Sequence, residues 1–393
     1  MTERVGESVA GAAADPSGFV APAYGERSLG DVIPAVAAAL GSPLARADGG
    51  GVDSVGLQLP SASAYVVFLV DGLGANLLRR YAHAAPFLAS LMDHSQPGTA
   101  GVPSTTATSL TSFGTALTPG GHGLVGFTSR VPGTDHLLNA LQWSKDIDPL
   151  EWQPNPTAFQ RLGEAGVPVT VINKREFSGS GLTLAAQRGA EYVGADKVGE
   201  RIAAAVTVSG QRGSLTYLYD GDLDWTGHKY GVSSSPWLQQ LSMIDAEAEQ
   251  LRDALDPSTR LLVVADHGMV DSPQTTRTDV DECPELRDGV VLLGGEARFR
   301  HLYCAQGAVD DVVAAWRSVL VGQAEVMTRE AAIRRGWFGP VTPAVLPRLG
   351  DVVVASYADH AVVSTTDFPY EKKLLGLHGS LTPDEMLIPL LVS

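Results

Sequence analysis

Cysteine is scarce in this chain. Of its 393 residues only Cys283 and Cys304 are cysteines, and they do not form a CxxC pair. This count excludes a disulfide framework and a thiolate zinc site, so reduced thiols are the expected state. At this length the chain can instead bury a large hydrophobic core, either as one α/β domain or with a smaller inserted cap.

Long apolar runs are also absent. No stretch of about 18 apolar residues occurs, which excludes a membrane-spanning helix from the predicted elements. The first seven residues, Met1 to Glu7, carry acidic side chains and lack the apolar centre of a signal peptide. The sequence therefore predicts a cytoplasmic protein.

Basic residues are fewer than acidic residues in this chain. The chain has 28 Lys and Arg against 44 Asp and Glu, which gives a net charge of −16. Proteins that bind nucleic acids neutralise phosphates with clustered Lys and Arg, and the sequence has no such cluster. The charge balance therefore argues against a nucleic-acid partner, and the hydrophobic content of 44% is ordinary for a globular protein.

From Ala64 onward, apolar β-branched runs alternate with helical patterns. This alternation predicts a three-layer α/β/α core with a largely parallel sheet and helices on both faces. The expected strands are 65–70, 168–172, 214–219 and 261–265, and the expected helices are 74–92, 106–117, 157–165, 197–206 and 236–255.

The flanking segments have different patterns. Residues 1–60 are rich in Ala, Gly, Ser and Pro and contain one expected helix at 29–40, so we predict an N-terminal extension. Residues 285–370 predict a smaller α+β cap, with hairpin-like strands at 289–304 and 351–364 and helices at 308–321 and 328–335. The hydrolase core would then comprise 61–284 and 371–393, with a last strand near 386–392.

Six residues of the metal-ligand type stand in four places that follow an apolar strand or open a glycine turn. They are Asp71, Asp224 with His228, Asp266 with His267, and His378. Three carboxylates and three imidazoles suffice for two zinc-like ions with open positions, the arrangement that hydrolyses phosphate esters. Manganese or iron also suits such ligands.

Taken singly, these places have simpler interpretations. A lone Asp-x-x-x-His spacing is weak evidence for a metal site, and His378 by itself would be a satisfied loop histidine. Asp71 could cap the helix that follows it. Adjacent residues in a strand point to opposite faces, so Asp266 and His267 can share a metal only if the chain turns, which Gly268 permits. The stretch after Asp71 partly imitates a dinucleotide-binding fingerprint but lacks its third glycine, so an NAD site is disfavoured.

The segment Pro103 to Thr108 is rich in hydroxyl groups and leads into an expected helix. A hydroxyl at a helix N-terminus is close to backbone N–H groups that stabilise a bound phosphoryl group. Thr105 or Thr106 could therefore be a nucleophile, although either could also be a simple N-cap. Metal coordination would supply the activation that an isolated threonine lacks.

As an ordered set, these residues resemble the alkaline phosphatase superfamily, and most closely its nucleotide pyrophosphatase/phosphodiesterase (type I phosphodiesterase) branch. The branch has the order Asp, nucleophilic Thr, Asp-x-x-x-His, Asp-His and His-Gly, which this chain reproduces from about residue 64 to its end. The resemblance selects Thr106, since Pro103 stands three positions before it. It implies one metal at Asp224, His228 and His378, and another at Asp71, Asp266 and His267.

One position departs from the branch. The resemblance implies an Asn a few residues after a His-Gly turn, where it donates to a phosphoryl oxygen, but Phe127 stands at that place. A phenyl ring cannot donate a hydrogen bond. Asn139, Asn173 or Lys174 are the side chains expected to replace that donor, beside the metals and the Thr106 N–H.

The resemblance implies a hydrolase that forms a covalent phosphothreonine and cleaves phosphodiesters or nucleotide pyrophosphates. Its partner would be a small phosphorylated substrate such as a nucleotide. Two alternatives stay open, a phosphomonoesterase or phosphonate hydrolase of the same fold, and a metal-binding protein that has lost turnover. A sulfatase is disfavoured because the chain has no Cys-x-Pro-x-Arg run.

Overall fold

The core of the protein is a six-stranded sheet. The computed structural model describes residues 18–47, 51–53 and 55–393. Within them the sheet has the order β18-β8-β1-β7-β5-β6. Only β18 is antiparallel to its neighbour, so the expected parallel sheet is confirmed. Its strands are β1 (Ala64–Val70), β5 (Val169–Asn173), β6 (Glu191–Gly194), β7 (Leu215–Asp220), β8 (Thr259–Val264) and β18 (Leu390–Val392).

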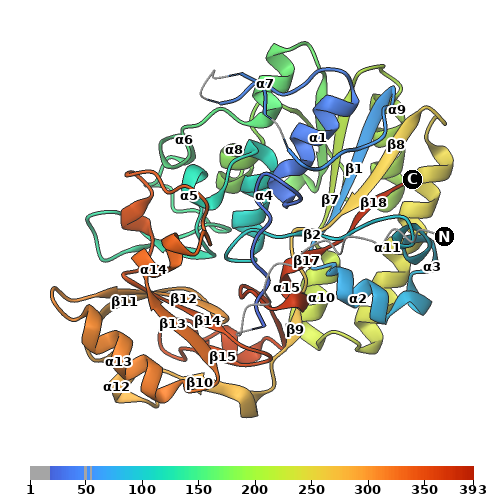
Figure 1. The fold of residues 1–393 in the computed structure, drawn as a ribbon. Coiled ribbons are helices and arrows are strands. Elements are labelled where there is room, and N and C mark those ends of the chain that lie inside the picture. The colour runs from blue at the N-terminus through green and yellow to red at the C-terminus, as the bar shows by residue number, and fades with distance from the viewer. Residues whose placement is uncertain (1–17, 48–50, 54) are drawn as a thin grey trace, which may run out of the picture.

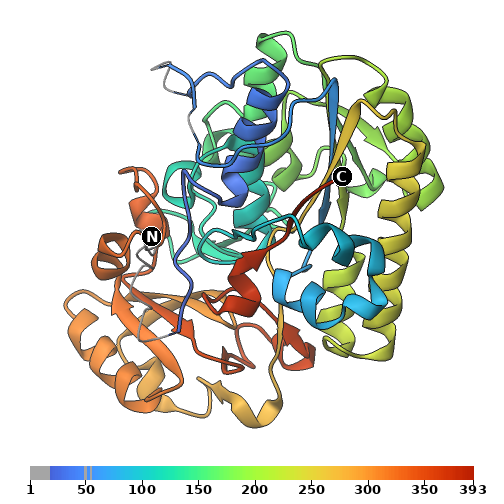
Figure 2. The same ribbon diagram turned by 45° about the vertical axis from the view of Figure 1, so that its right-hand side comes forward.

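The strands of the sheet centre are buried on both faces. All seven residues of β1 are buried, which requires a helical layer on each side. Figures 1 and 2 show these layers, with α4 and α7 on one side and α9 and α11 on the other. The helices are α4 (Thr106–Thr115), α7 (Ala158–Glu164), α9 (Val198–Ser209) and α11 (Ser235–Ala254). The expected three-layer α/β/α core is therefore present.

Two expected elements are broken by proline. The predicted helix 74–92 is split into α2 (Ala75–Arg80), a 3-10 turn (Ala82–Ala84) and α3 (Pro86–Met92). Proline lacks the N–H that continues a helix but fits its first position, so α3 begins at Pro86. Pro389 likewise separates β17 (Leu387–Ile388) from β18 within the predicted strand 386–392.

A second, antiparallel sheet lies beside the core, in orange in Figure 1. Its order is β11-β12-β14-β13, from Val290–Glu296, Phe299–Cys304, Val352–Ser356 and Ala324–Thr328. Helices α13 (Val309–Val319) and α14 (Arg329–Arg334) occur where the sequence predicts them. The expected hairpin at 289–304 is correct, but the one at 351–364 is wrong. Both edges of β14 are occupied by β12 and β13, so β15 (Ala361–Val363) pairs with β10 (Arg277–Asp279) instead.

The described part of the N-terminal segment is packed on the core. A 3-10 turn (Leu29–Asp31) leads into α1 (Val32–Ala39), as predicted for 29–40. Leu29, Ile33 and Val36 are fully buried in the main hydrophobic cluster. Among the described residues, no helix is both long and apolar enough to cross a membrane.

Candidate metal centre

Three neighbouring strands deliver the acidic residues to one edge of the sheet. Asp71 follows β1 directly, and Asp266 lies just beyond the end of β8. The third carboxylate, Asp224, stands on α10 (Asp222–Tyr230), which begins just after β7. The carboxyl ends of parallel strands lie at the same edge, where ligands of α/β proteins gather. The alternation of strands and helices therefore brings these side chains together.

The first group consists of Asp71, Asp266 and His267, all buried. One potential ligand atom from each lies within 4.8 Å of the others. The Nε2 atom of His267 is 3.4 Å from Asp71 Oδ1 and 3.4 Å from Asp266 Oδ2. Asp266 Oδ1 accepts hydrogen bonds from the backbone N–H groups of Gly72 and His267. Its Oδ2 is buried without a hydrogen-bond partner among the described residues.

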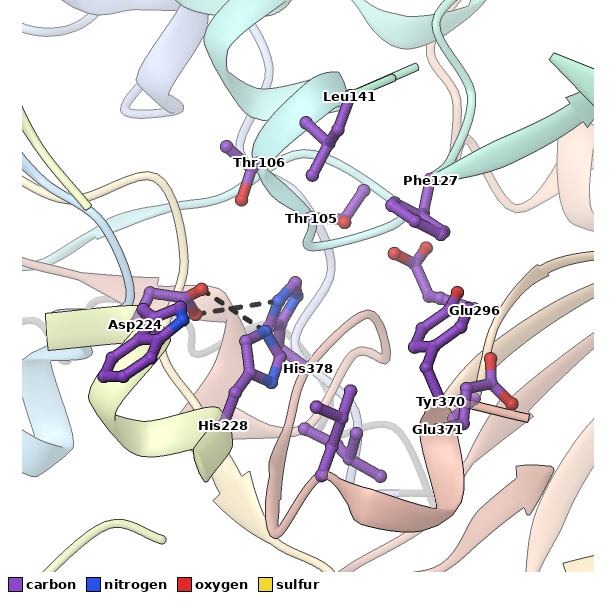
Figure 3. A pocket seen from close by; sticks show the side chains of 14 residues that line it. Thr105, Thr106, Phe127, Leu141, Asp224, His228, Glu296, Tyr370, Glu371 and His378 are labelled. Carbon is purple, nitrogen blue, oxygen red and sulfur yellow. Dashed lines mark ion pairs between the residues drawn. The ribbon is translucent and has the colours of Figure 1, made fainter. Parts of the chain in front are cut away.

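The second group consists of Asp224, His228 and His378. The expected helical turn is present as α10, which places Asp224 and His228 on one face. Asp224 Oδ2 is 3.3 Å from His228 Nε2, and Asp224 Oδ1 is 3.7 Å from His378 Nε2, as the dashed lines of Figure 3 show. Asp224 Oδ1 is another buried oxygen that no hydrogen bond satisfies within the described chain.

All three imidazoles are held in the same way. The Nδ1 atoms of His228, His267 and His378 lie 2.8, 3.0 and 3.0 Å from the backbone oxygens of Gly376, Gly268 and Ser104. Because a carbonyl can only accept, each Nδ1 carries the hydrogen, and in the neutral ring each Nε2 keeps its lone pair. Metal-binding histidines are commonly oriented by this kind of bond.

The carboxylates are crowded. Burial and the nearby charges of Asp266 and Asp224 raise the pKa of Asp71 well above its usual value. Burial also raises the pKa of Asp266. Burial alone would raise the pKa of Asp224 too, but the imidazole of His228 lowers it. Two unsatisfied carboxylate oxygens and three Nε2 lone pairs in so small a volume fit divalent cations, whose charge would offset the repulsion.

Thr106 lies against the first group. It is the first residue of α4, and its Oγ1 is 3.3 Å from Asp71 Oδ2 and 3.2 Å from His267 Nε2. Thr105 is the N-cap residue, and its hydroxyl lies beside Glu296 instead. Of the two candidate hydroxyls, the structure brings only that of Thr106 to the Asp/His cluster.

Two cavities open on either side of Thr106. The smaller measures about 270 Å³ and the larger about 580 Å³. Both are lined by Thr106, Leu141, Asp224 and Trp225. The smaller one is also lined by Phe127, Glu296 and Tyr370, and the larger one by Asn173, Lys174, Phe177, Tyr219 and Asp222.

The predicted substrate-contacting side chains are divided between these cavities. Phe127 lines the smaller one, and Asn173 and Lys174 line the larger, where Lys174 Nζ is 2.6 Å from Asp222 Oδ1. Asn139 lines neither of them. Its Oδ1 accepts the N–H groups of Leu141 and Gln142, because an Asn side chain readily closes its own turn.

Sequence reasoning missed three residues of the site. Tyr219 donates a hydrogen bond to Asp71 Oδ2, while Glu296 and Tyr370 line the smaller cavity. Tyr219 is the penultimate residue of β7, so the strand-end pattern could have indicated it. Glu296 ends β11 at a tight hairpin, where an acidic residue usually indicates only a solvated turn.

Comparison by sequence identifies one family. Residues 65–381 match the family described as type I phosphodiesterase / nucleotide pyrophosphatase. The match covers most of the chain and confirms the predicted hydrolase class. No curated protein matches the chain.

Solved structures share the fold at low sequence identity. Murine ectonucleotide pyrophosphatase/phosphodiesterase 5 has a TM-score of 0.65 and 17% identity over 84% of this chain and 87% of its own. An inactive variant of it was solved in complex with AMP, with a TM-score of 0.65, 16% identity and the same coverage. Phosphonoacetate hydrolase from Sinorhizobium meliloti, in complex with phosphonoformate, has a TM-score of 0.64 and 18% identity over 86% and 91%.

Proposed function

The chain belongs to the type I phosphodiesterase/nucleotide pyrophosphatase family, and from this premise we propose that it hydrolyses phosphodiester or nucleotide pyrophosphate bonds with Thr106 as nucleophile. One observation carries the proposal. The Thr106 hydroxyl lies against the first Asp/His group, and Thr106 lines both cavities together with Asp224 of the second group.

The ligand set would hold two divalent cations. Asp224, His228 and His378 would bind one, and Asp71, Asp266 and His267 the other, with zinc as the best match and manganese or iron as further options. When bound, such cations would lower the pKa of the threonine hydroxyl and offset the charge of phosphoryl oxygens.

The protein's own groups orient the reaction. The Thr106 hydroxyl donates toward Asp71, which leaves an oxygen lone pair free to attack phosphorus. A bond from Thr106 Oγ1 to phosphorus forms while the bond to the leaving alcohol or phosphate oxygen breaks, and the threonine proton ends on that leaving oxygen. Water then cleaves the bond between Thr106 and phosphorus, adding its hydroxyl group to phosphorus and its proton to Thr106 Oγ1. The N-terminus of α4 directs backbone N–H groups at the phosphoryl oxygens.

The two cavities support a diester over a monoester. A diester carries two organic substituents on phosphorus, and each cavity offers room for one. Lys174, Phe177 and Tyr219 give the larger cavity a cation and aromatic rings, which suit a nucleoside. The murine variant solved in complex with AMP supports a nucleotide-like substituent.

The test compares two esters. Zinc-loaded protein should hydrolyse bis(4-nitrophenyl) phosphate faster than 4-nitrophenyl phosphate, and chelation should abolish both activities until zinc is restored. Thr106→Ala should lower diester turnover on the order of 10⁴-fold or more while keeping the metal content, because the ligands remain.

Thr105→Ala is the matched control and should keep most activity, since that hydroxyl faces Glu296. Full activity of metal-free protein, or a labelled phosphoryl adduct trapped on Thr105, would refute the proposal.

A further inference from the structure

The smaller cavity contains one carboxylate without a partner. Glu296 is 8% exposed, and both of its carboxylate oxygens are buried without a hydrogen-bond partner in the described chain. Figure 3 shows it beside Thr105 and Phe127, at the opposite side of the cavity from Asp224. The neighbouring Thr105 hydroxyl favours the ionised form but lies outside hydrogen-bond geometry. A buried carboxylate of this kind is costly unless a ligand completes it.

The other carboxylates of this region already have partners. Glu371 forms an ion pair with the Nη2 atom of Arg300. Glu385 accepts hydrogen bonds from Arg298 at 2.6 Å and 2.8 Å. Each arginine thus has one acid as its ion-pair partner, although Arg300 Nη1 has no hydrogen-bond partner in the described chain. The charge of Arg300 favours the ionised form of Glu296, but no ion pair joins the two, so among these three carboxylates only Glu296 lacks an ion pair.

The walls around Glu296 are aromatic and apolar. The rings of Phe127 and Tyr370 lie 6.0 Å apart in an edge-to-face arrangement, and Leu374 and Leu377 complete the lining. Aromatic rings attract organic cations, and a nearby carboxylate adds charge complementarity. A metal ion needs several oxygen or nitrogen ligands, whereas Glu296 belongs to neither Asp/His group.

We propose that the smaller cavity binds an ammonium group on one ester substituent of the substrate, with Glu296 as its counter-ion. The inference rests on the proposed function, because the substituent reaches this cavity only when phosphorus lies at Thr106. Drug-sized ligands occupy cavities of about 300–1,000 Å³. At about 270 Å³ this one suits a small amino-alcohol ester, and the larger cavity would take the bulkier substituent.

The charge state of Glu296 depends on the groups beside it. Burial, together with the charges of Glu371 and Glu385, raises the pKa of Glu296 to about 8. An ammonium group beside it would favour the ionised form, so carboxylate and cation would stabilise each other.

The experiment compares two chromogenic diesters that differ in one atom. They are 4-nitrophenyl phosphorylcholine and 4-nitrophenyl 3,3-dimethylbutyl phosphate, in which carbon replaces the quaternary nitrogen. The zinc-loaded enzyme should prefer the cationic ester by at least about tenfold in kcat/KM. Glu296→Gln should bring that ratio to about one. Asp222→Asn, which neutralises a carboxylate of the larger cavity, should keep it.

A second measurement needs neither turnover nor a variant. By titration calorimetry, the unmodified protein should bind choline at least about tenfold more tightly than 3,3-dimethylbutan-1-ol. Equal turnover of the two esters, or equal binding of the two alcohols, would overturn the ammonium site and leave the proposed function intact. A loss in Glu296→Gln that is equal for both esters would assign this residue to the phosphoryl group instead. Hydrolysis of neither ester would refute the proposed function itself, and the calorimetry would still test the cavity.

Discussion

Asp266→Asn should have opposite effects on the metal-free and the metal-loaded protein. The substituted side chain keeps an oxygen that can accept from the N–H groups of Gly72 and His267. It replaces the unpartnered Oδ2 by an amide that can donate to Asp71, while one negative charge leaves a cluster of three carboxylates. The metal-free variant should therefore be at least as stable as the metal-free parent.

With zinc bound, Asp266→Asn should be stabilised less than the parent, because the first group would lose a charged ligand. At a free zinc concentration 100 times its Kd, one site stabilises the folded state by about 2.7 kcal/mol. Unfolding entropy is about 2.1 cal/mol/K per residue, so for 393 residues this corresponds to a Tm increase of about 3 °C per site. We expect about twice that increase for the parent and only the single-site value for Asp266→Asn.

Differential scanning calorimetry with chelator and then with zinc measures both effects, and elemental analysis counts the bound ions. Asp271→Asn is the matched control, since Asp271 also accepts a backbone N–H, from Val232, but lies outside both Asp/His groups. It should keep the full zinc response. A metal-free Asp266→Asn protein that melts well below the parent, or one that still binds two ions, would refute this account of the cluster.

Three further predictions concern the walls of the site. Glu296→Gln should remove a pH dependence of stability. Since the folded pKa of Glu296 is raised from 4.5 to about 8, its contribution is fully present below pH 4.5 and is lost as pH rises to about 8, at about 1.4 kcal/mol per pH unit. The raised pKa values of Asp71 and Asp266 give a loss of the same sign in both proteins, so urea unfolding with chelator present should show a slope that is steeper by this amount in the parent. Phe127→Asn should speed hydrolysis of a neutral diester, since loss of one preorganised donor costs ~100–1,000-fold elsewhere, and slower turnover would contradict an impaired site. Gly268→Ala would place its Cβ 2.0 Å from the backbone oxygen of Asp384 and should lower the unfolding free energy by about 1–3 kcal/mol or more. The control Gly163→Ala, whose Cβ would meet nothing within 4 Å, should not lower it. Equal urea midpoints for the two variants would exclude the steric argument.

Four residues of the two Asp/His groups could be brought together from local sequence patterns. A strand read from its apolar residues has a known carboxyl end, and parallel strands place those ends side by side, so Asp71 and Asp266 could be expected to meet. The spacing of Asp224 and His228 likewise indicates a shared helix face. The breaks in the predicted helix 74–92 and strand 386–392 could have been anticipated from Pro86 and Pro389.

The contacts that involve the second sheet could not be predicted in this way. Glu296 reaches the site because β11 and the core come together in three dimensions, and no local pattern near residue 296 indicates that approach. Asn139 illustrates the converse error. It has the right chemistry for a phosphate contact, but its own turn uses its oxygen. Residue type therefore predicts a role only where a strand end or helix face also fixes the direction of the side chain.

The residues proposed for chemistry and those that line the smaller cavity come from different parts of the fold. The Asp/His groups and Thr106 lie at strand ends and at a helix terminus of the core, whereas Phe127, Glu296 and Tyr370 come from loops and from the second sheet. The residue that replaces the expected Asn therefore does not stand alone, because Phe127 contacts Tyr370 and lies beside Glu296 in the same wall. A single change to Asn would add a hydrogen-bond donor but also remove an aromatic ring that faces the proposed ammonium group. Phe127→Asn should thus raise turnover of neutral diesters and lower the preference for cationic ones. If the neutral and the cationic diester were both hydrolysed faster by the same factor, Phe127 would have no part in binding the ammonium group.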